Sequence, residues 1–196
     1  MSLKVALFVG SCRTGRMADR VLRLVRSHLE ERGHQVLLID PEEEPNLLAV
    51  RKPVHFHGPD ENVAPWLDAV HQKVLQADAF LLLSPEYNRC IAPALTSAMD
   101  NFPPSSYRHK PCGVVCYSIG TGGGQSAAAQ LRSFLGELGA LTMPTVCMWA
   151  KVHEIITESG TTERESVKST LGQLLAELEW YSAALLNHKA KCGTPS

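Results

Sequence analysis

The sequence predicts an α/β domain built on a doubly wound, five-stranded parallel sheet with helices on both faces. Residues 80–83 form a continuous apolar run that stops at Pro85, which is typical of a parallel strand buried under helices on both sides. Further apolar runs alternate with segments of helical period along the rest of the chain. Right-handed crossovers between parallel strands place the intervening helices on both faces of such a sheet.

The N-terminal half alternates between strands and helices. Strands are expected at residues 3–9 and 36–39 and in the run that begins at Phe80. Between the first two, apolar residues of helical spacing end at Gly33, a natural helix C-terminus: Ala18, Val21, Leu22, Val25 and Leu29. Residues 41–60 contain four prolines and no clear period, so they predict a long surface connection. Helices are expected around residues 66–74 and 94–102, on either side of the Phe80 strand.

The C-terminal half continues the alternation. Strands are expected at residues 111–119 and 141–148, with a helix at 125–138 between them and Gly139 behind it. The last helix is expected to begin near Thr162, whose spacing to Glu165 fits a capping box, and to continue to Leu185. We therefore predict a single domain over residues 1–187 and a disordered tail over 188–196.

Composition and charge exclude several classes of function. Hydrophobic residues make up 44% of the chain, charged residues 20%, and the formal net charge is −1, so nucleic acid and membranes are not expected partners. No stretch approaches eighteen consecutive apolar residues, and we expect cytoplasmic residence. The six cysteines lack zinc-ligand spacing and are expected to be reduced, with Cys12 and Cys90 in candidate site loops. His55 and His57 are interpreted as solvated, and no metal site is predicted.

The predicted strand order, 2-1-3-4-5, brings three unusual loops together. In this order the carboxyl ends of the first, third and fourth strands lie side by side at the ligand-binding edge of the sheet. Those ends carry the sequences GSCRTGR, SPEYNRC and YSIGTGGG. A site is therefore expected in the crevice between them.

The first loop has the composition of a phosphate cradle. Backbone N–H groups at a helix N-terminus bind anions, the hydroxyls of Ser11 and Thr14 add donors, and Arg13 and Arg16 carry positive charge. A nucleotide triphosphatase loop is not indicated, because Arg16 and Met17 stand where that motif has lysine and a hydroxyl residue. The dinucleotide fingerprint is absent as well. The alternative is a tight turn with exposed arginines.

The other two loops also allow two interpretations. The glycine-rich loop at residues 118–124 lets the backbone approach a flat ligand, or it is a flexible connection between strand and helix. Glu86 could act as a base, but we favour a role in fixing the loop backbone or contacting a neighbouring subunit.

The segments GSCRTGR, SPEYNRCIAPALTSAMDN and YSIGTGGGQSAAAQLRSFLGELGA resemble the signature segments of the NADPH-dependent FMN reductase family over most of residues 3–150. The resemblance implies a flavodoxin-like fold, bound FMN, NADPH or NADH as co-substrate and a small-molecule acceptor such as a quinone, azo dye or flavin. It also implies a homodimer or tetramer, a possibility that the apolar residues Ile91, Met99 and Phe102 favour. The implied cofactor-binding residues are Ser11, Arg13, Thr14, Arg16, Met17, Pro85, Glu86, Tyr87, Asn88, Tyr117, Ser118, Gly120, Gly122 and Gly123.

The mechanism that the resemblance implies needs no catalytic acid or base. The flavin N5 would be the reactive centre, with ping-pong kinetics, and the protein would bind and orient. Cys90 and the sequence MDNFPP depart from the usual family pattern, so the ring environment and the substrate gate are expected to differ. The alternative function is a non-enzymatic FMN protein, either an electron carrier or a redox-dependent interaction module.

Overall fold

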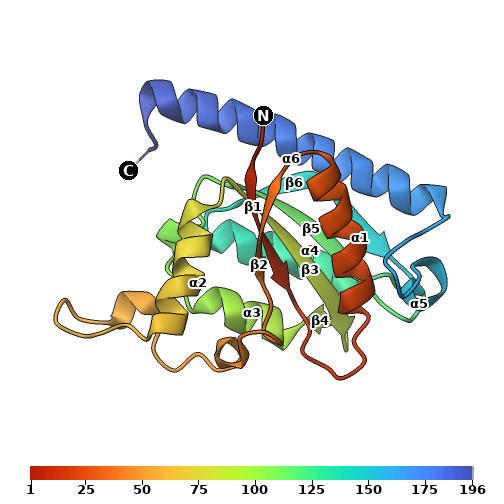
Figure 1. The fold of residues 1–196 in the computed structure, drawn as a ribbon, viewed down its shortest axis with the longest axis horizontal. Coiled ribbons are helices and arrows are strands. Elements are labelled where there is room, and N and C mark those ends of the chain that lie inside the picture. The colour runs from red at the N-terminus through yellow and green to blue at the C-terminus, as the bar shows by residue number, and fades with distance from the viewer. Residues whose placement is uncertain (196) are drawn as a thin grey trace.

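A central parallel sheet lies between two layers of helices (Figure 1). The computed structural model describes residues 1–195. Neighbouring strands of the main sheet are all parallel, in the order β2, β1, β3, β5, β6. Their bounds are β1 Lys4–Val9, β2 Gln35–Ile39, β3 Ala79–Tyr87, β5 Pro111–Tyr117 and β6 Leu141–Trp149. The predicted α/β architecture with a parallel sheet is confirmed.

The predicted count of five strands is wrong by one. β4, Cys90–Ile91, folds back antiparallel on the end of β3 and is the sixth strand, so the order reads 2-1-3-5-6 with β4 beside β3. The reversal occurs at Asn88 and Arg89, which have φ angles of 52° and 64°. Two successive positive φ angles are typical of a two-residue hairpin turn. Asn-Arg lacks the glycine that usually marks this turn, so the sequence predicts a loop here and not a hairpin.

Helices cover both faces of the sheet, as predicted. α1 (Ala18–Glu31) and α6 (Glu165–Cys192) pack on one face, and α2 (Pro65–Gln76), α3 (Pro93–Asp100) and α4 (Gln125–Glu137) on the other. Side chains alternate along each strand: Val5 and Leu7 of β1 face the first layer, while Ala6 and Phe8 face the second. Each fully buried large apolar side chain contributes about 1.5–3 kcal/mol to folding. Helices thus cover both faces of the sheet, and the strand ends remain available to bind a ligand.

The C-terminal helix differs from the sequence prediction at both ends. α6 begins at Glu165, and Thr162 accepts the Arg164 N–H at 3.1 Å and donates to the Ile155 carbonyl at 2.6 Å, so the predicted capping box is wrong. The helix ends at Cys192, beyond residue 187, where the sequence placed the end of the domain. Residue 196 lies outside the described residues. Figure 1 shows α6 as the longest helix, running across the width of the molecule.

The remaining segments are mostly connections. Residues 41–60 contain two short 3-10 helices, Pro45–Leu48 and Val54–Phe56, within the predicted surface connection. A short helix that sequence analysis missed, α5 (Val152–Ile155), follows β6. Within residues 1–195, no helix combines the length and the apolar character needed to cross a bilayer.

Met99 and Phe102 are buried in the core of the chain itself, so they give no support to a homodimer.

All six cysteines are free, as expected. Cys112, Cys116 and Cys147 are buried, and burial raises the pKa of each thiol above its ordinary value, which keeps it protonated. Cys12, Cys90 and Cys192 are exposed.

Candidate functional site

The three loops meet in a cavity of about 600 Å³ at the carboxyl ends of β1, β3 and β5, called here the strand-end cavity. Strand register brings them together: Val9 pairs with Leu83, and Pro85 pairs with Tyr117. Every residue named above as a cofactor ligand lines this cavity except Gly123. Sequence analysis missed five further lining residues: Gly15, Arg89, Ile119, Thr121 and Val152. The grouping is as expected, and the role of these residues in binding stays a prediction.

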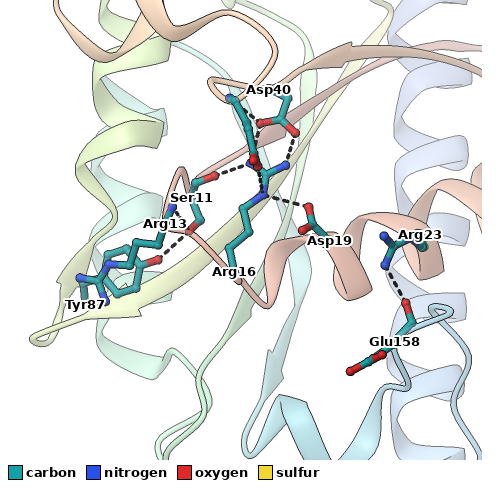
Figure 2. A network of polar contacts seen from close by, with 9 residues as sticks. Ser11, Arg13, Arg16, Asp19, Arg23, Asp40, Tyr87 and Glu158 are labelled. Atoms are coloured by element: carbon teal, nitrogen blue, oxygen red, sulfur yellow. Dashed lines mark hydrogen bonds and ion pairs between the residues drawn. The ribbon is translucent and has the colours of Figure 1, made fainter.

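Ser11 and Tyr87 connect the first loop to the β3–β4 hairpin. The two hydroxyl oxygens lie 2.7 Å apart, and Ser11 is 1% exposed. The Arg13 guanidinium carbon stacks 3.5 Å from the centroid of the Tyr87 ring, as Figure 2 shows. A cation over an aromatic face is attracted by the quadrupole of the ring. These contacts hold Arg13 at the cavity without using its charge in an ion pair.

Arg16 is paired with carboxylates of the protein itself. Its guanidinium forms a bidentate pair with Asp40, at 2.6 Å on both sides, and its Nε lies 2.9 Å from Asp19 and 2.8 Å from Glu42. Nη1 also donates to the Ser11 carbonyl at 2.5 Å. Figure 2 shows the side chain between Asp19 and Asp40.

These carboxylates compensate the charge of Arg16 within the protein. Burial alone would lower the pKa of the guanidinium, but the hydrogen bonds and charges of Asp40 and Asp19 outweigh it and hold the pKa above its ordinary value. Asp40 lies just after β2, so the pair ties the first loop to a neighbouring strand end. The expectation that Arg16 helps to neutralise a phosphate stays a prediction. The charge of Arg16 is already paired with carboxylates of the protein, whereas Arg13 forms no ion pair within residues 1–195.

Glu86 fixes the hairpin to α4. One carboxylate oxygen accepts the backbone N–H groups of Ser126 and Ala127, at 2.7 and 3.1 Å. These donors belong to the first turn of α4, where backbone N–H groups lack partners inside the helix and the helix dipole attracts negative charge. The favoured interpretation of Glu86 as a residue that fixes the backbone agrees with this geometry.

Replacing Glu86 with alanine is expected to lower the free energy of unfolding by about 0.5–2 kcal/mol, as the loss of a helix cap does. Urea unfolding followed by circular dichroism measures the change. Glu137→Ala removes an exposed carboxylate at the other end of α4 and should change stability by less than about 0.5 kcal/mol. Equal effects of the two variants would contradict the capping role.

The glycine-rich loop is fixed in place, contrary to its interpretation as a flexible connection. The Ser118 hydroxyl donates to the Gly120 carbonyl and accepts the Gly123 N–H, both at 3.0 Å. Backbone hydrogen bonds from Lys151 to Gly120 and from Val152 to Ser118 join the loop to the segment after β6. Gly123 packs behind the loop against Met148 and Ala150, which explains why it does not line the cavity.

Tyr117 lines the strand-end cavity and has a buried hydroxyl without a partner among the described residues. The residue is 2% exposed, yet among the described residues its hydroxyl has no hydrogen-bond partner. Burial raises the pKa of Tyr117 well above its ordinary value, and the neighbouring Tyr87 adds to the shift, so the hydroxyl stays protonated and can donate. A buried polar group without a partner costs about 1–3 kcal/mol, so a ligand that pairs with it relieves that cost.

Comparisons with known proteins agree with this geometry. The chain is 31% identical over 126 residues to an NADPH:quinone oxidoreductase of Arabidopsis thaliana, a match that covers 62% of this chain and 64% of that protein. The chain thus spans less than two thirds of this relative. It is 26% identical over 147 residues to an FMN-dependent NADPH-azoreductase of Staphylococcus saprophyticus, covering 73% of this chain and 74% of the relative.

The fold has a solved counterpart as well. FerB, a flavoenzyme NAD(P)H:(acceptor) oxidoreductase from Paracoccus denitrificans, superimposes with a TM-score of 0.72 over 92% of this chain and 98% of FerB, at 23% sequence identity. An archaeal flavodoxin superimposes with a TM-score of 0.54 over 91% of this chain and 99% of its own, at 14% identity. The fold is therefore flavodoxin-like. The family model for NADPH-dependent FMN reductases matches residues 3–154. With its three loops and this match, the chain belongs to the NADPH-dependent FMN reductase family.

Proposed function

We propose that the chain binds FMN in the strand-end cavity and acts as an NAD(P)H-dependent oxidoreductase that reduces a small acceptor such as a quinone, an azo compound or a flavin. Bound FMN supplies the capacity to take a hydride from a reduced nicotinamide and to pass electrons to a second acceptor. Because donor and acceptor would use the same strand-end cavity in turn, we propose ping-pong kinetics. The meeting of the three loops in one cavity is the observation that carries the proposal. The unpaired Tyr117 hydroxyl is a further group that bound FMN could pair with.

The donor set of the cavity suits a phosphorylated, planar cofactor. Arg13 and the backbone of the first loop would hold the phosphate, with Arg16 keeping the loop in shape. Gly120 and Gly122 carry no side chain that would keep a flat ring from the backbone of the third loop. Tyr87 would give the ring an aromatic neighbour while its hydroxyl stays paired with Ser11. These residues bind and orient.

No residue of the cavity is assigned a proton-transfer role. Glu86, the lining carboxylate, is engaged by two backbone N–H groups of α4 and is thereby held as an acceptor. Tyr117 stays protonated because burial raises the pKa of its hydroxyl. The contribution of the protein is therefore orientation and fixed hydrogen-bond donors, which stabilise developing charge without an acid or base.

The activity is tested with the FMN-loaded protein, NADPH and a water-soluble benzoquinone. We expect NADPH oxidation that depends on the quinone, with parallel lines in double-reciprocal plots as the quinone concentration is varied. Binding of FMN without NADPH oxidation would favour the electron carrier or interaction module instead. Intersecting lines would contradict the ping-pong scheme while leaving the oxidoreductase intact.

Tyr117→Phe is expected to weaken FMN binding about two- to tenfold, the equivalent of one lost hydrogen bond. The FMN-free variant should be at least as stable as the parent, because the unpaired buried hydroxyl is gone. FMN dissociation constants from flavin fluorescence and urea unfolding of the FMN-free protein measure the two effects.

Tyr107→Phe is the matched control for this experiment. Tyr107 is equally buried, but its hydroxyl donates to the Met99 carbonyl at 2.8 Å and lies outside the strand-end cavity. Its loss should lower stability by about 0.5–1.5 kcal/mol and leave FMN affinity unchanged. The reverse pattern, with Tyr117→Phe destabilising the FMN-free protein and leaving FMN affinity intact, would rule out a ligand role for Tyr117.

We also propose a homodimer, on the strength of the family alone. Light scattering of the FMN-loaded protein tests this directly, and the mass of a single chain would contradict the proposed homodimer.

A further inference from the structure

A second cavity, of about 570 Å³, lies at the opposite edge of the sheet and is called here the strand-start cavity. It is bounded by the segment that joins α2 to β3, by the start of β5 and by the C-terminal end of α6. It shares no lining residue with the strand-end cavity. Nothing in the proposed FMN chemistry uses it.

The polar lining of the strand-start cavity is strongly cationic. Arg108, Lys110 and Lys189 line it together with His109 and His188, against one carboxylate, Asp78. Within residues 1–195, none of these basic side chains forms an ion pair. The Asp78 carboxylate accepts the backbone N–H of Lys4 at 2.8 Å. Within residues 1–195 these positive charges outnumber the one carboxylate beside them and repel one another, so this arrangement favours an anion between them.

Lys110 is held in the cavity by the backbone. Its ammonium donates to the carbonyls of Val74 and Leu75, at 2.9 and 3.1 Å, at the end of α2. An ammonium has three N–H donors, so one remains for a ligand. Burial, with a smaller contribution from the charge of Lys189 and an opposing one from Asp78, lowers the pKa of Lys110 to about 8, which places the two cations close together. At neutral pH Lys110 is still charged.

His109 adds an unused polar atom to the same wall. Its Nε2 is buried and has no hydrogen-bond partner among the described residues. Its backbone has a φ of 65° and is fixed by a hydrogen bond from its N–H to the Gly139 carbonyl, at 2.9 Å. A buried nitrogen without a partner carries a desolvation cost that a bound acceptor or donor removes.

The rest of the lining is apolar. Leu75 and Ala77 come from the end of α2, Pro111 from the start of β5, and Leu185 and Leu186 from α6. Leu75 is 45% exposed, an unusual fraction for a leucine that borders a cavity. Ligand cavities combine apolar walls of this kind with a few convergent polar groups.

We propose that the strand-start cavity binds a small organic anion that has a phosphate-type dianionic head and an apolar body. Arg108, Lys110 and Lys189 neutralise the head, and Leu75, Leu185 and Leu186 contact the body. The site is separate from the FMN site, so its occupancy does not depend on the proposed oxidoreductase activity. An anion in this cavity also screens the repulsion between Lys110 and Lys189.

The test uses 1-naphthyl phosphate as the probe, with protein already saturated with FMN so that the strand-end cavity is filled. Isothermal titration is compared with inorganic phosphate, which has the head alone, and with 1-naphthol, which has the body alone. We expect saturable binding of 1-naphthyl phosphate at least tenfold tighter than either. Equal binding of 1-naphthol would mean an apolar site only, and absence of saturation by 1-naphthyl phosphate would overturn the proposal.

Matched lysine variants locate the binding. Lys189→Gln should weaken 1-naphthyl phosphate binding at least fivefold, whereas Lys191→Gln, two residues further along α6 and outside the lining, should leave it unchanged. Cys192 also lines the cavity and gives a second readout: the probe should slow its alkylation, followed by mass spectrometry, without slowing that of Cys90. Equal affinities of the two lysine variants, together with unprotected Cys192, would place the probe elsewhere and contradict the proposal.

Discussion

Replacing Arg16 with methionine is expected to lower the free energy of unfolding of the FMN-free protein by about 3–5 kcal/mol, the usual cost of removing one partner of a buried ion pair. The side chains of Arg16 and Asp40 are 5% and 2% exposed. Without the guanidinium, the Asp40 carboxylate would stay buried beside Asp19 and Glu42, with no cation to compensate it. Urea unfolding measures the loss.

Arg26→Met is the matched control, because it removes an ion-paired arginine from α1, the helix that follows the loop containing Arg16. Arg26 pairs with Glu30 at 2.7 Å, but both side chains are about half exposed. Exposed pairs contribute at most about 1 kcal/mol. Adding Asp40→Asn to Arg16→Met should recover part of the loss, because the uncompensated charge is then removed. A loss in Arg16→Met no larger than that in Arg26→Met would contradict the structural role given to this pair.

The same substitution should weaken FMN binding. Arg16 donates to the Ser11 carbonyl and therefore holds the backbone of the first loop, whose N–H groups are proposed to receive the phosphate. We expect at least a tenfold increase in the FMN dissociation constant, measured by flavin fluorescence without urea. Unchanged affinity would show that the loop keeps its shape without Arg16.

Gly124→Ala is expected to be the second most damaging substitution. Gly124 has a φ of 88°, where an alanine costs about 1–2 kcal/mol. A Cβ there would lie 2.6 Å from the Cys116 Cβ and 2.9 Å from the Tyr117 backbone nitrogen. Overpacking of this kind adds about 1–3 kcal/mol. Because the overlap is with the backbone of Tyr117, the substitution should also disturb the strand-end cavity and lower FMN affinity.

Gly136→Ala controls for the change of residue type. Gly136 lies in the last turn of α4, the helix that begins just after Gly124, and a Cβ there would meet no atom within 4 Å. Alanine should raise the unfolding free energy by about 0.5–1 kcal/mol, because glycine is a poor helix former. Thermal unfolding of both variants should therefore shift in opposite directions. A Gly124→Ala protein as stable as the parent would contradict the close packing described for this loop.

The sheet and the position of the site follow from local patterns in the sequence. The apolar run at residues 80–83 identifies a strand buried on both faces. In a parallel sheet, ligands bind at the edge formed by the carboxyl ends of the strands, so the topology predicts where the site lies. The sequence pattern therefore predicts that the loops containing Ser11, Tyr87 and Ser118 lie at one edge of the sheet. The structure brings them into one cavity there.

The features that sequence analysis missed depend on pairing between distant residues. The partner of Arg16, Asp40, lies on a different strand, and no local pattern links them. β4 depends on two residues with positive φ that lack the usual glycine. Arg89 at that turn lines the cavity, and its position as a basic residue directly after PEYN was the available signal. The proposed capping box failed because Thr162 hydrogen-bonds to Ile155 in the preceding connection instead.

The most direct test of the account is an FMN titration of the purified protein, followed by visible absorbance, with NADPH then added under anaerobic conditions. The account predicts saturable binding, weakened by Tyr117→Phe and unaffected by Tyr107→Phe, and loss of the flavin's visible absorbance on addition of NADPH. Failure to bind FMN would contradict the assignment of the strand-end cavity as the flavin site, and binding that ignores Tyr117→Phe would contradict the role given to the Tyr117 hydroxyl.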